Sequence, residues 1–169
     1  MNKNIRWITE TAVMLALLIA LQAVTKPLGQ LVTGSFVNAV LAVTVLVAGC
    51  SSGLTVAIIS PVLAYLLGIT GQILTVPPIM AGNAAFVLAL YFIAGKDSRK
   101  LLRQILAWIS AAGVKFMLLY VLVVWLLGHL LPPIALASFS WPQLVTALIG
   151  GGVALLITPV LRKARHHFG

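Results

Sequence analysis

Lys115 is the residue whose chemistry most needs an explanation, because it lies midway along a long apolar segment, residues 102–128. A charged side chain near the centre of a bilayer costs at least about 2.5–3.5 kcal/mol on insertion scales. Both ends of the segment are too distant for the lysine to reach the membrane surface, and no carboxylate is placed to pair with it. Its partners are therefore backbone carbonyls, water or an anionic ligand. We predict that Lys115 binds a ligand, with a hydrated structural lysine as the alternative.

Uncharged polar side chains are expected at a similar depth in the other apolar segments. They are Gln22, Asn38, Asn83, Gln143 and Thr146, and Tyr120 is expected to line the same space. Each amide alone is equally well explained by a hydrogen bond between helices. Their convergence with an unpaired lysine predicts an apolar cavity with a few orienting polar groups, which is the usual form of a small-molecule site. Trp125 and Trp141 either line this cavity or belong to the aromatic belt at the membrane surface.

The chain lacks the residues that catalysis needs. Its two carboxylates, Glu10 and Asp97, are far apart in the sequence and are expected to offset neighbouring cations. The three histidines and the single cysteine have no metal-ligand spacing, and no G-x-x-x-x-G-K-[ST] sequence for ATP hydrolysis is present. The absence of acidic residues within the apolar segments argues against proton or sodium coupling. We expect a non-enzymatic protein without a metal or cofactor of its own, which takes energy for any transport from a partner.

Composition and charge place these residues in a membrane. The chain is 62% hydrophobic and 8% charged, with a mean hydropathy of +1.15, whereas soluble domains carry about 25% charged residues. The net charge of +9 comes from cations at both ends and in the run 96–103, with no stripe that would bind nucleic acid. Cytoplasmic loops of membrane proteins retain positive charge. Both termini and the 96–103 loop are therefore predicted to be cytoplasmic.

Six apolar runs are long enough to cross a bilayer: 8–25, 34–50, 53–70, 74–94, 102–128 and 142–161. Every backbone polar group must be satisfied within the protein in lipid, so we predict an all-α integral membrane protein, one domain over 1–169 with six transmembrane helices. The basic, apolar start resembles a signal peptide but has no cleavage site, and is expected to be a retained first helix. Outer loops are predicted at 26–33, 70–74 and 129–141.

Small residues recur in the first and last of these runs. Ala12, Ala16 and Ala20 are spaced four apart, on one face of the first predicted helix. Gly150-Gly151-Gly152 lies in the sixth. Small residues allow close helix approach in membranes. The alanine strip is therefore expected either to pack within the protein or to dock on another membrane protein.

These features resemble the substrate-binding S components of energy-coupling factor (ECF) vitamin transporters. The resemblance lies in a chain of 169 residues with six predicted helices, no ATPase motif, alanines four apart in the first helix and Gly82-Asn83 in the fourth. The segments 8–22 and 26–34 look like members of this family from Gram-positive bacteria. The family's shared sequence features are loose, although the resemblance spans the chain.

The resemblance implies an ATP-driven importer in the cell membrane, built with a shared transmembrane coupling subunit and two ATPase subunits that use the ATP. It implies that Ala12, Ala16 and Ala20 dock on the coupling subunit. It also implies that the first outer loop, with Lys26 and Gln30, gates the pocket, and that ligand contacts come mostly from the outer parts of helices four to six.

The unpaired Lys115 favours an anionic vitamin, and pantothenate is the first choice. Folate is also anionic, but its large aromatic system would need more stacking residues. A neutral compound such as hydroxymethylpyrimidine or a pyridoxine-like vitamin, bound by amides, is the alternative. A structural membrane protein without a pocket is a second alternative. A self-sufficient channel is disfavoured, because the inner half of the predicted bundle is almost purely apolar.

Overall fold

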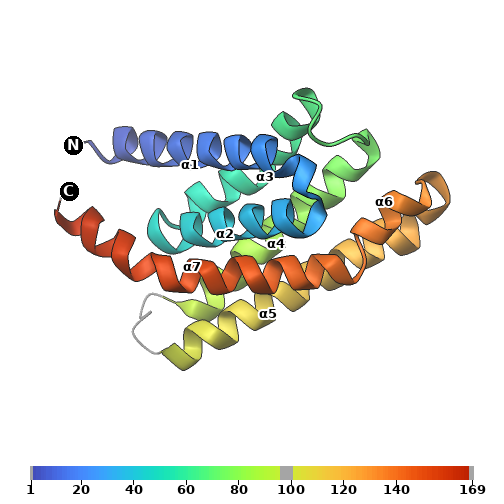
Figure 1. The fold of residues 1–169 in the computed structure, drawn as a ribbon. Helices are drawn as coiled ribbons and strands as arrows, with labels where there is room; N and C mark the ends of the chain where they lie inside the picture. The colour runs from blue at the N-terminus through green and yellow to red at the C-terminus, as the bar shows by residue number, and fades with distance from the viewer. Residues whose placement is uncertain (1, 96–100, 168–169) are drawn as a thin grey trace.

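A computed structural model of the chain, which describes residues 2–95 and 101–167, is a bundle of helices (Figure 1). Its long helices are α1 Lys3–Thr25, α2 Gln30–Val47, α3 Cys50–Leu66, α4 Val76–Ala94, α5 Leu101–Leu119 and α7 Trp141–His167. A π-helical segment, Tyr120–Leu126, continues α5. Short elements connect the rest: 3-10 turns at Lys26–Leu28, Ile73–Thr75 and Gly128–Leu130, and the short helix α6, Pro133–Ser138. Asp97 and the cations Lys96, Arg99 and Lys100 lie outside the described residues.

Both ends of the chain lie at one end of the bundle, here called the terminal end (Figure 1). The C-terminus of α4 and the N-terminus of α5 lie there too, whereas the turn after α1 and helix α6 lie at the opposite end, here called the far end (Figure 1). The start of α1, the end of α7, the end of α4 and the start of α5 are thus at the same end of the bundle.

Five helical stretches in the described residues are long and apolar enough to cross a membrane. They contain α1, α2, α4, α5 and α7, and the protein is a multi-pass membrane protein. The remaining predicted span corresponds to α3, which has 17 residues. At 1.5 Å per residue it is about 25 Å long, shorter than a typical bilayer core of about 30 Å.

Two of the predicted outer loops are largely helical. The prediction of a loop at 26–33 is wrong in detail, because α2 begins at Gln30, directly after Gly29. Gly29 has a φ of 88°, a conformation that glycine adopts without strain, so the chain turns sharply there and the next helix starts early. The loop predicted at 129–141 contains α6, which begins at Pro133, where the fixed φ of proline suits the first turn of a helix.

Glycine allows a close contact between α2 and α7. A Cβ on Gly150 would lie 2.7 Å from the backbone nitrogen of Ala39, and one on Gly34 would lie 2.9 Å from Thr146 Cγ2. The two backbones can approach this closely because neither glycine carries a side chain. The contact brings Asn38 of α2 next to Thr146 of α7, at 3.3 Å, and so helps to form the site described below.

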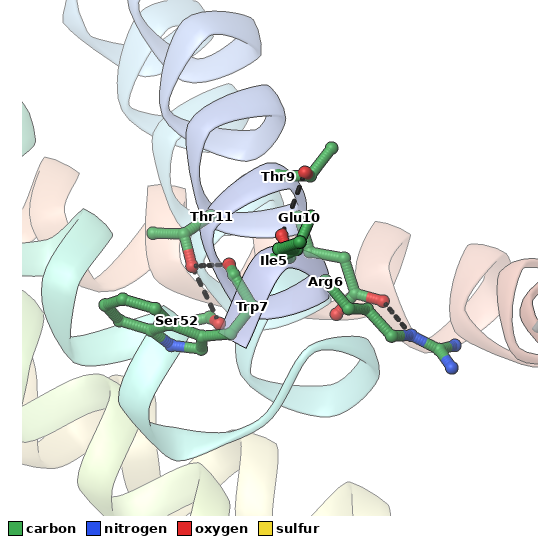
Figure 2. Close-up of polar contacts among 7 residues, drawn as sticks. All are labelled: Ile5, Arg6, Trp7, Thr9, Glu10, Thr11 and Ser52. Atoms are coloured by element: carbon green, nitrogen blue, oxygen red, sulfur yellow. Dashed lines mark hydrogen bonds and ion pairs between the residues drawn. The ribbon is translucent and has the colours of Figure 1, made fainter. Parts of the chain in front are cut away.

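Helix α1 packs by one side only, against α2 and α3, and is the least buried of the five candidate spans. Its N-terminal half is attached to α3 by a hydrogen bond between the hydroxyls of Thr11 and Ser52, 2.9 Å apart (Figure 2). Arg6 Nε donates to Glu10 Oε1 at 2.9 Å (Figure 2). Glu10 therefore offsets a neighbouring cation, as predicted. The other side of α1 faces away from the bundle.

Candidate functional site: a polar cavity at the far end

A cavity of about 270 Å³ opens at the far end of the bundle. Its walls come from the end of α1, the start of α2, the α3–α4 connection, the first half of α4, the second half of α5, α6 and the start of α7. The volume is close to the lower end of the range for ligand sites, about 300–1,000 Å³. A small ligand therefore suits it better than a large conjugated ring system.

Lys115 lines this cavity and is 3% exposed. Its Nζ donates to Asn38 Oδ1 at 2.5 Å and to Asn83 Oδ1 at 2.7 Å, and it lies 5.6 Å from the centroid of the Phe86 ring. The amide oxygens and the ring stabilise an ammonium group, but they are neutral and do not cancel its charge. An ammonium has three N–H donors, so one remains for a ligand in the cavity.

The amide of Asn38 is oriented by a chain of hydrogen bonds behind the cavity wall. Its Nδ2 donates to the Gly34 carbonyl at 2.9 Å and to Thr146 Oγ1 at 3.3 Å. Thr146 Oγ1 in turn donates to the Gln143 carbonyl at 3.0 Å. Because both N–H groups of the amide are directed to acceptors, its oxygen points at Lys115. Helices α2, α5 and α7 thus meet at one hydrogen-bonded centre, and Asn83 adds α4.

Most of the predicted binding residues lie on this cavity. Its lining includes Lys115, Asn83, Asn38, Gln22 and Gln143. Thr146 is fully buried behind the wall and reaches the cavity only through Asn38. Gln143 Nε2 donates to the Ser138 carbonyl at 3.2 Å, which attaches α6 to α7.

The predicted aromatic residues are absent from the cavity lining. Tyr120 is 42% exposed and packs against Phe116. It follows Lys115 by five residues, about 140° further around a helix, whereas Leu119 follows by four and does line the cavity. Trp125 and Trp141 are 81% and 63% exposed, as belt residues would be.

Sequence reasoning missed several lining residues. They are Thr33, the connection 69–72, Thr75, Ile79, the α6 residues Ala135 and Ser138, and Phe139 directly after α6. The polar Thr33 and Gln72 fall in the same outer layer of the sequence and could have been included by that rule. The α6 residues carried no signal, because that helix was not predicted.

Lys26 and Gln30, predicted to gate the pocket, are exposed residues of the cavity lining. Lys26 Nζ donates to the Gly68 carbonyl at 2.5 Å, which connects the turn after α1 to the end of α3. The contact joins two chain connections beside the cavity, since Lys26 lines it and Gly68 does not. It is solvent-exposed and uses one side chain, so opening it is inexpensive in free energy.

The alanine strip lies on the surface. Ala12, Ala16 and Ala20 are all exposed, which excludes packing inside the described part of the chain as their role. Beside them an apolar groove of about 510 Å³ runs between α1, α2 and α7, with Leu17 and Val43 among its lining residues. The groove lining is apolar except for Thr9 and Glu10.

The chemistry available in the cavity is binding. It offers one ammonium, several amides, hydroxyls and an apolar wall, with no nucleophile and base in hydrogen-bonding contact among its lining residues. The described residues also contain no cluster of three or more His, Cys, Asp or Glu side chains that could hold a metal ion. These groups can hold a small polar molecule by hydrogen bonds and charge.

Comparison with known proteins identifies the family. No curated protein and no solved structure matches the chain. One protein-family model, described as the substrate-specific component of ECF transporters, matches residues 10–162. This range includes every residue that lines the cavity. The chain therefore belongs to the family of substrate-specific components of ECF transporters, which are transporter subunits and not enzymes.

Proposed function

We propose that this protein captures a small anionic vitamin, with pantothenate as the first choice, and delivers it to an ATP-driven ECF importer. The observation that carries the proposal is the ammonium of Lys115, held in the cavity by the neutral oxygens of Asn38 and Asn83. A buried ammonium without a carboxylate partner in the described chain attracts an anion, because ligand binding then neutralises the charge. The small cavity favours pantothenate over folate.

A neutral ligand is the competing proposal, supported by the amides of Gln22 and Gln143 on the cavity. The test is a binding titration of the purified protein with pantothenate, with its analogue lacking the carboxylate, with pyridoxine and with hydroxymethylpyrimidine. We expect pantothenate to bind at least about 30-fold more tightly than its uncharged analogue. Equal binding of the two, or tight binding of a neutral vitamin alone, would refute the anionic assignment.

The orientation follows from charge. We place the protein in the cell membrane of a Gram-positive bacterium. The terminal end then faces the cytoplasm and the cavity faces outside, because Lys3, Arg6 and Arg162 lie near the termini. In a Cys50→Ser background, an impermeant thiol reagent applied to intact cells should label Ala135→Cys and miss Lys163→Cys. Labelling of the second position alone would reverse the orientation.

Energy would come from partners, a transmembrane coupling subunit and two ATPase subunits. The exposed strip of Ala12, Ala16 and Ala20 supports a docking surface for the coupling subunit, because close helix contact in lipid requires small residues. Co-purification from the native membrane is the test. Recovery of a coupling subunit with two ATPases is the expected result, and their absence from a ligand-binding preparation would refute this assembly.

A further inference from the structure

Two buried oxygen atoms on the cavity have no hydrogen-bond partner among the described residues. They are Gln22 Oε1, from α1, and Thr33 Oγ1, from α2. Both residues line the cavity, and neither belongs to the network of Lys115. Buried polar atoms are nearly always paired in native proteins, so an unpaired one needs an explanation. Here both unpaired atoms belong to the same cavity.

Thr33 differs from most other hydroxyl residues of these helices. Eight of them donate to the carbonyl four residues earlier: Thr9, Thr11, Thr25, Ser35, Thr44, Thr55, Ser138 and Thr158. The corresponding carbonyl for Thr33 is that of Gly29, which accepts only the backbone N–H of Thr33, at 3.1 Å. Its hydroxyl has thus not taken the partner that those eight use, although Thr33 is one of the residues that line the cavity.

The position of Thr33 separates it from the anion site. Along α2 the lining residues run from the exposed Gln30, through Thr33, to the buried Asn38. Thr33 and Asn38 are five residues apart, about 7.5 Å along a helix axis at 1.5 Å per residue. A ligand that reaches both must therefore carry two polar ends with a spacer between them.

We propose that Gln22 and Thr33 form a second polar subsite, which binds a hydroxyl group of the ligand at the end of the molecule opposite to its anionic group. A carbonyl oxygen such as Gln22 Oε1 only accepts, whereas the Thr33 hydroxyl donates or accepts. A ligand hydroxyl can do both as well, so it matches either residue. The inference rests on the proposed function and narrows the substrate class to hydroxylated carboxylates, to which pantothenate belongs.

The test compares Thr33→Val and Gln22→Met with wild type. At nearly constant volume, Thr33→Val replaces the hydroxyl with a methyl group and Gln22→Met removes the whole amide, oxygen and nitrogen. We expect both substitutions to weaken pantothenate binding about 5- to 30-fold. For a pantothenate analogue whose hydroxyls are replaced by hydrogen, the affinity of each variant should lie within about twofold of the wild-type affinity. Without ligand, their melting temperature should stay the same or rise, because an unpaired buried polar atom has been removed.

Thr44→Val is the matched control, since Thr44 is fully buried on the same helix, is away from the cavity lining and donates to the Val40 carbonyl at 2.6 Å. Its melting temperature should fall while its affinity for pantothenate stays unchanged. Thr33 is structural, and the subsite is refuted, under either of two results. In the first, Thr33→Val lowers the melting temperature and leaves pantothenate affinity unchanged, as Thr44→Val does. In the second, Thr33→Val weakens the binding of pantothenate and of the analogue lacking hydroxyls equally.

The same variants separate this inference from the anionic assignment. Wild type that binds pyridoxine and not pantothenate, with weaker pyridoxine binding in both variants, would refute the anion and support the hydroxyl subsite. Unchanged pantothenate binding in both variants would refute the subsite and leave the anion assignment standing. Wild type that binds neither vitamin, nor hydroxymethylpyrimidine, would overturn both.

Discussion

Replacing Lys115 with methionine removes the charge from the cavity and keeps most of the side-chain volume. For an anionic ligand the change leaves a carboxylate buried and unpaired, which typically costs about 2–5 kcal/mol, or about 30- to several-thousand-fold in Kd. The protein itself changes in two opposing ways. Asn38 and Asn83 each lose the donor to their Oδ1, at about 1–3 kcal/mol per unpaired oxygen. At the same time the variant is stabilised, because it no longer buries a charged ammonium group.

The informative quantity is therefore the difference between two ligands, in which the change in protein stability cancels. Isothermal titration of wild type and Lys115→Met with pantothenate and with its analogue lacking the carboxylate gives this difference. We expect the variant to lose at least about 30-fold for pantothenate and less than about threefold for the analogue. Lys115→Arg should recover binding only in part, since a planar fork replaces a compact ammonium. Tyr120→Leu, outside the cavity lining, serves as the control. Equal losses for both ligands would mean that Lys115 shapes the cavity without recognising charge.

Two further predictions concern helix contacts. Ala16→Trp should abolish co-purification of the coupling subunit and leave ligand affinity intact, because the indole ring projects from the exposed alanine strip. Leu156→Trp, at another exposed position, is the control. Loss of ligand binding with an intact complex would contradict the docking role of the strip. Gly150→Ala should lower the melting temperature, equivalent to about 1–3 kcal/mol, because its Cβ would meet the backbone of α2. Gly113→Ala, with no atom within 4 Å of its Cβ, should be neutral or stabilising, and equal effects in a thermal unfolding assay would refute the close-contact argument.

Hydrophobicity and charge were sufficient to predict the helices, because a long apolar run in lipid has no alternative to helix. They were insufficient for the connections. Helix α6 has 6 residues, too short for a periodic pattern, and its start depends on the local geometry of Pro132 and Pro133. The length of α3 shows the same limit. Hydropathy continues to residue 70, but the helix ends at Leu66, before the positive φ of Gly68.

The lysine and its amide neighbours were predictable as a group because polar residues in apolar helices are few. Their pairing was not. Asn38 and Asn83 are 77 and 32 residues from Lys115 in sequence, and only the packing of α2, α4 and α5 brings them together. The role of Thr146 also depended on packing, since its place behind Asn38 results from the close approach at Gly34. That these polar residues lie at one level of the bundle could be predicted from the sequence, whereas the rotation of each helix about its axis could not.

The choice of amides in place of a carboxylate beside Lys115 has a consequence for binding. An aspartate would pair with the ammonium, cancel its charge and repel an incoming anion, whereas asparagine holds the ammonium at 2.7 Å and leaves its charge for the ligand. Asn83→Asp, which changes one heavy atom in the side chain, should therefore weaken pantothenate binding at least as much as Lys115→Met does, by about 30-fold or more. Its melting temperature should not fall, because an ion pair replaces a hydrogen bond from the ammonium to a neutral amide. Asn83→Ala, which removes that hydrogen bond without adding a charge, should reduce the free energy of pantothenate binding by about 1–3 kcal/mol. Affinity titrations that rank Asn83→Asp as the milder change would show that the ligand carries no negative charge at this position.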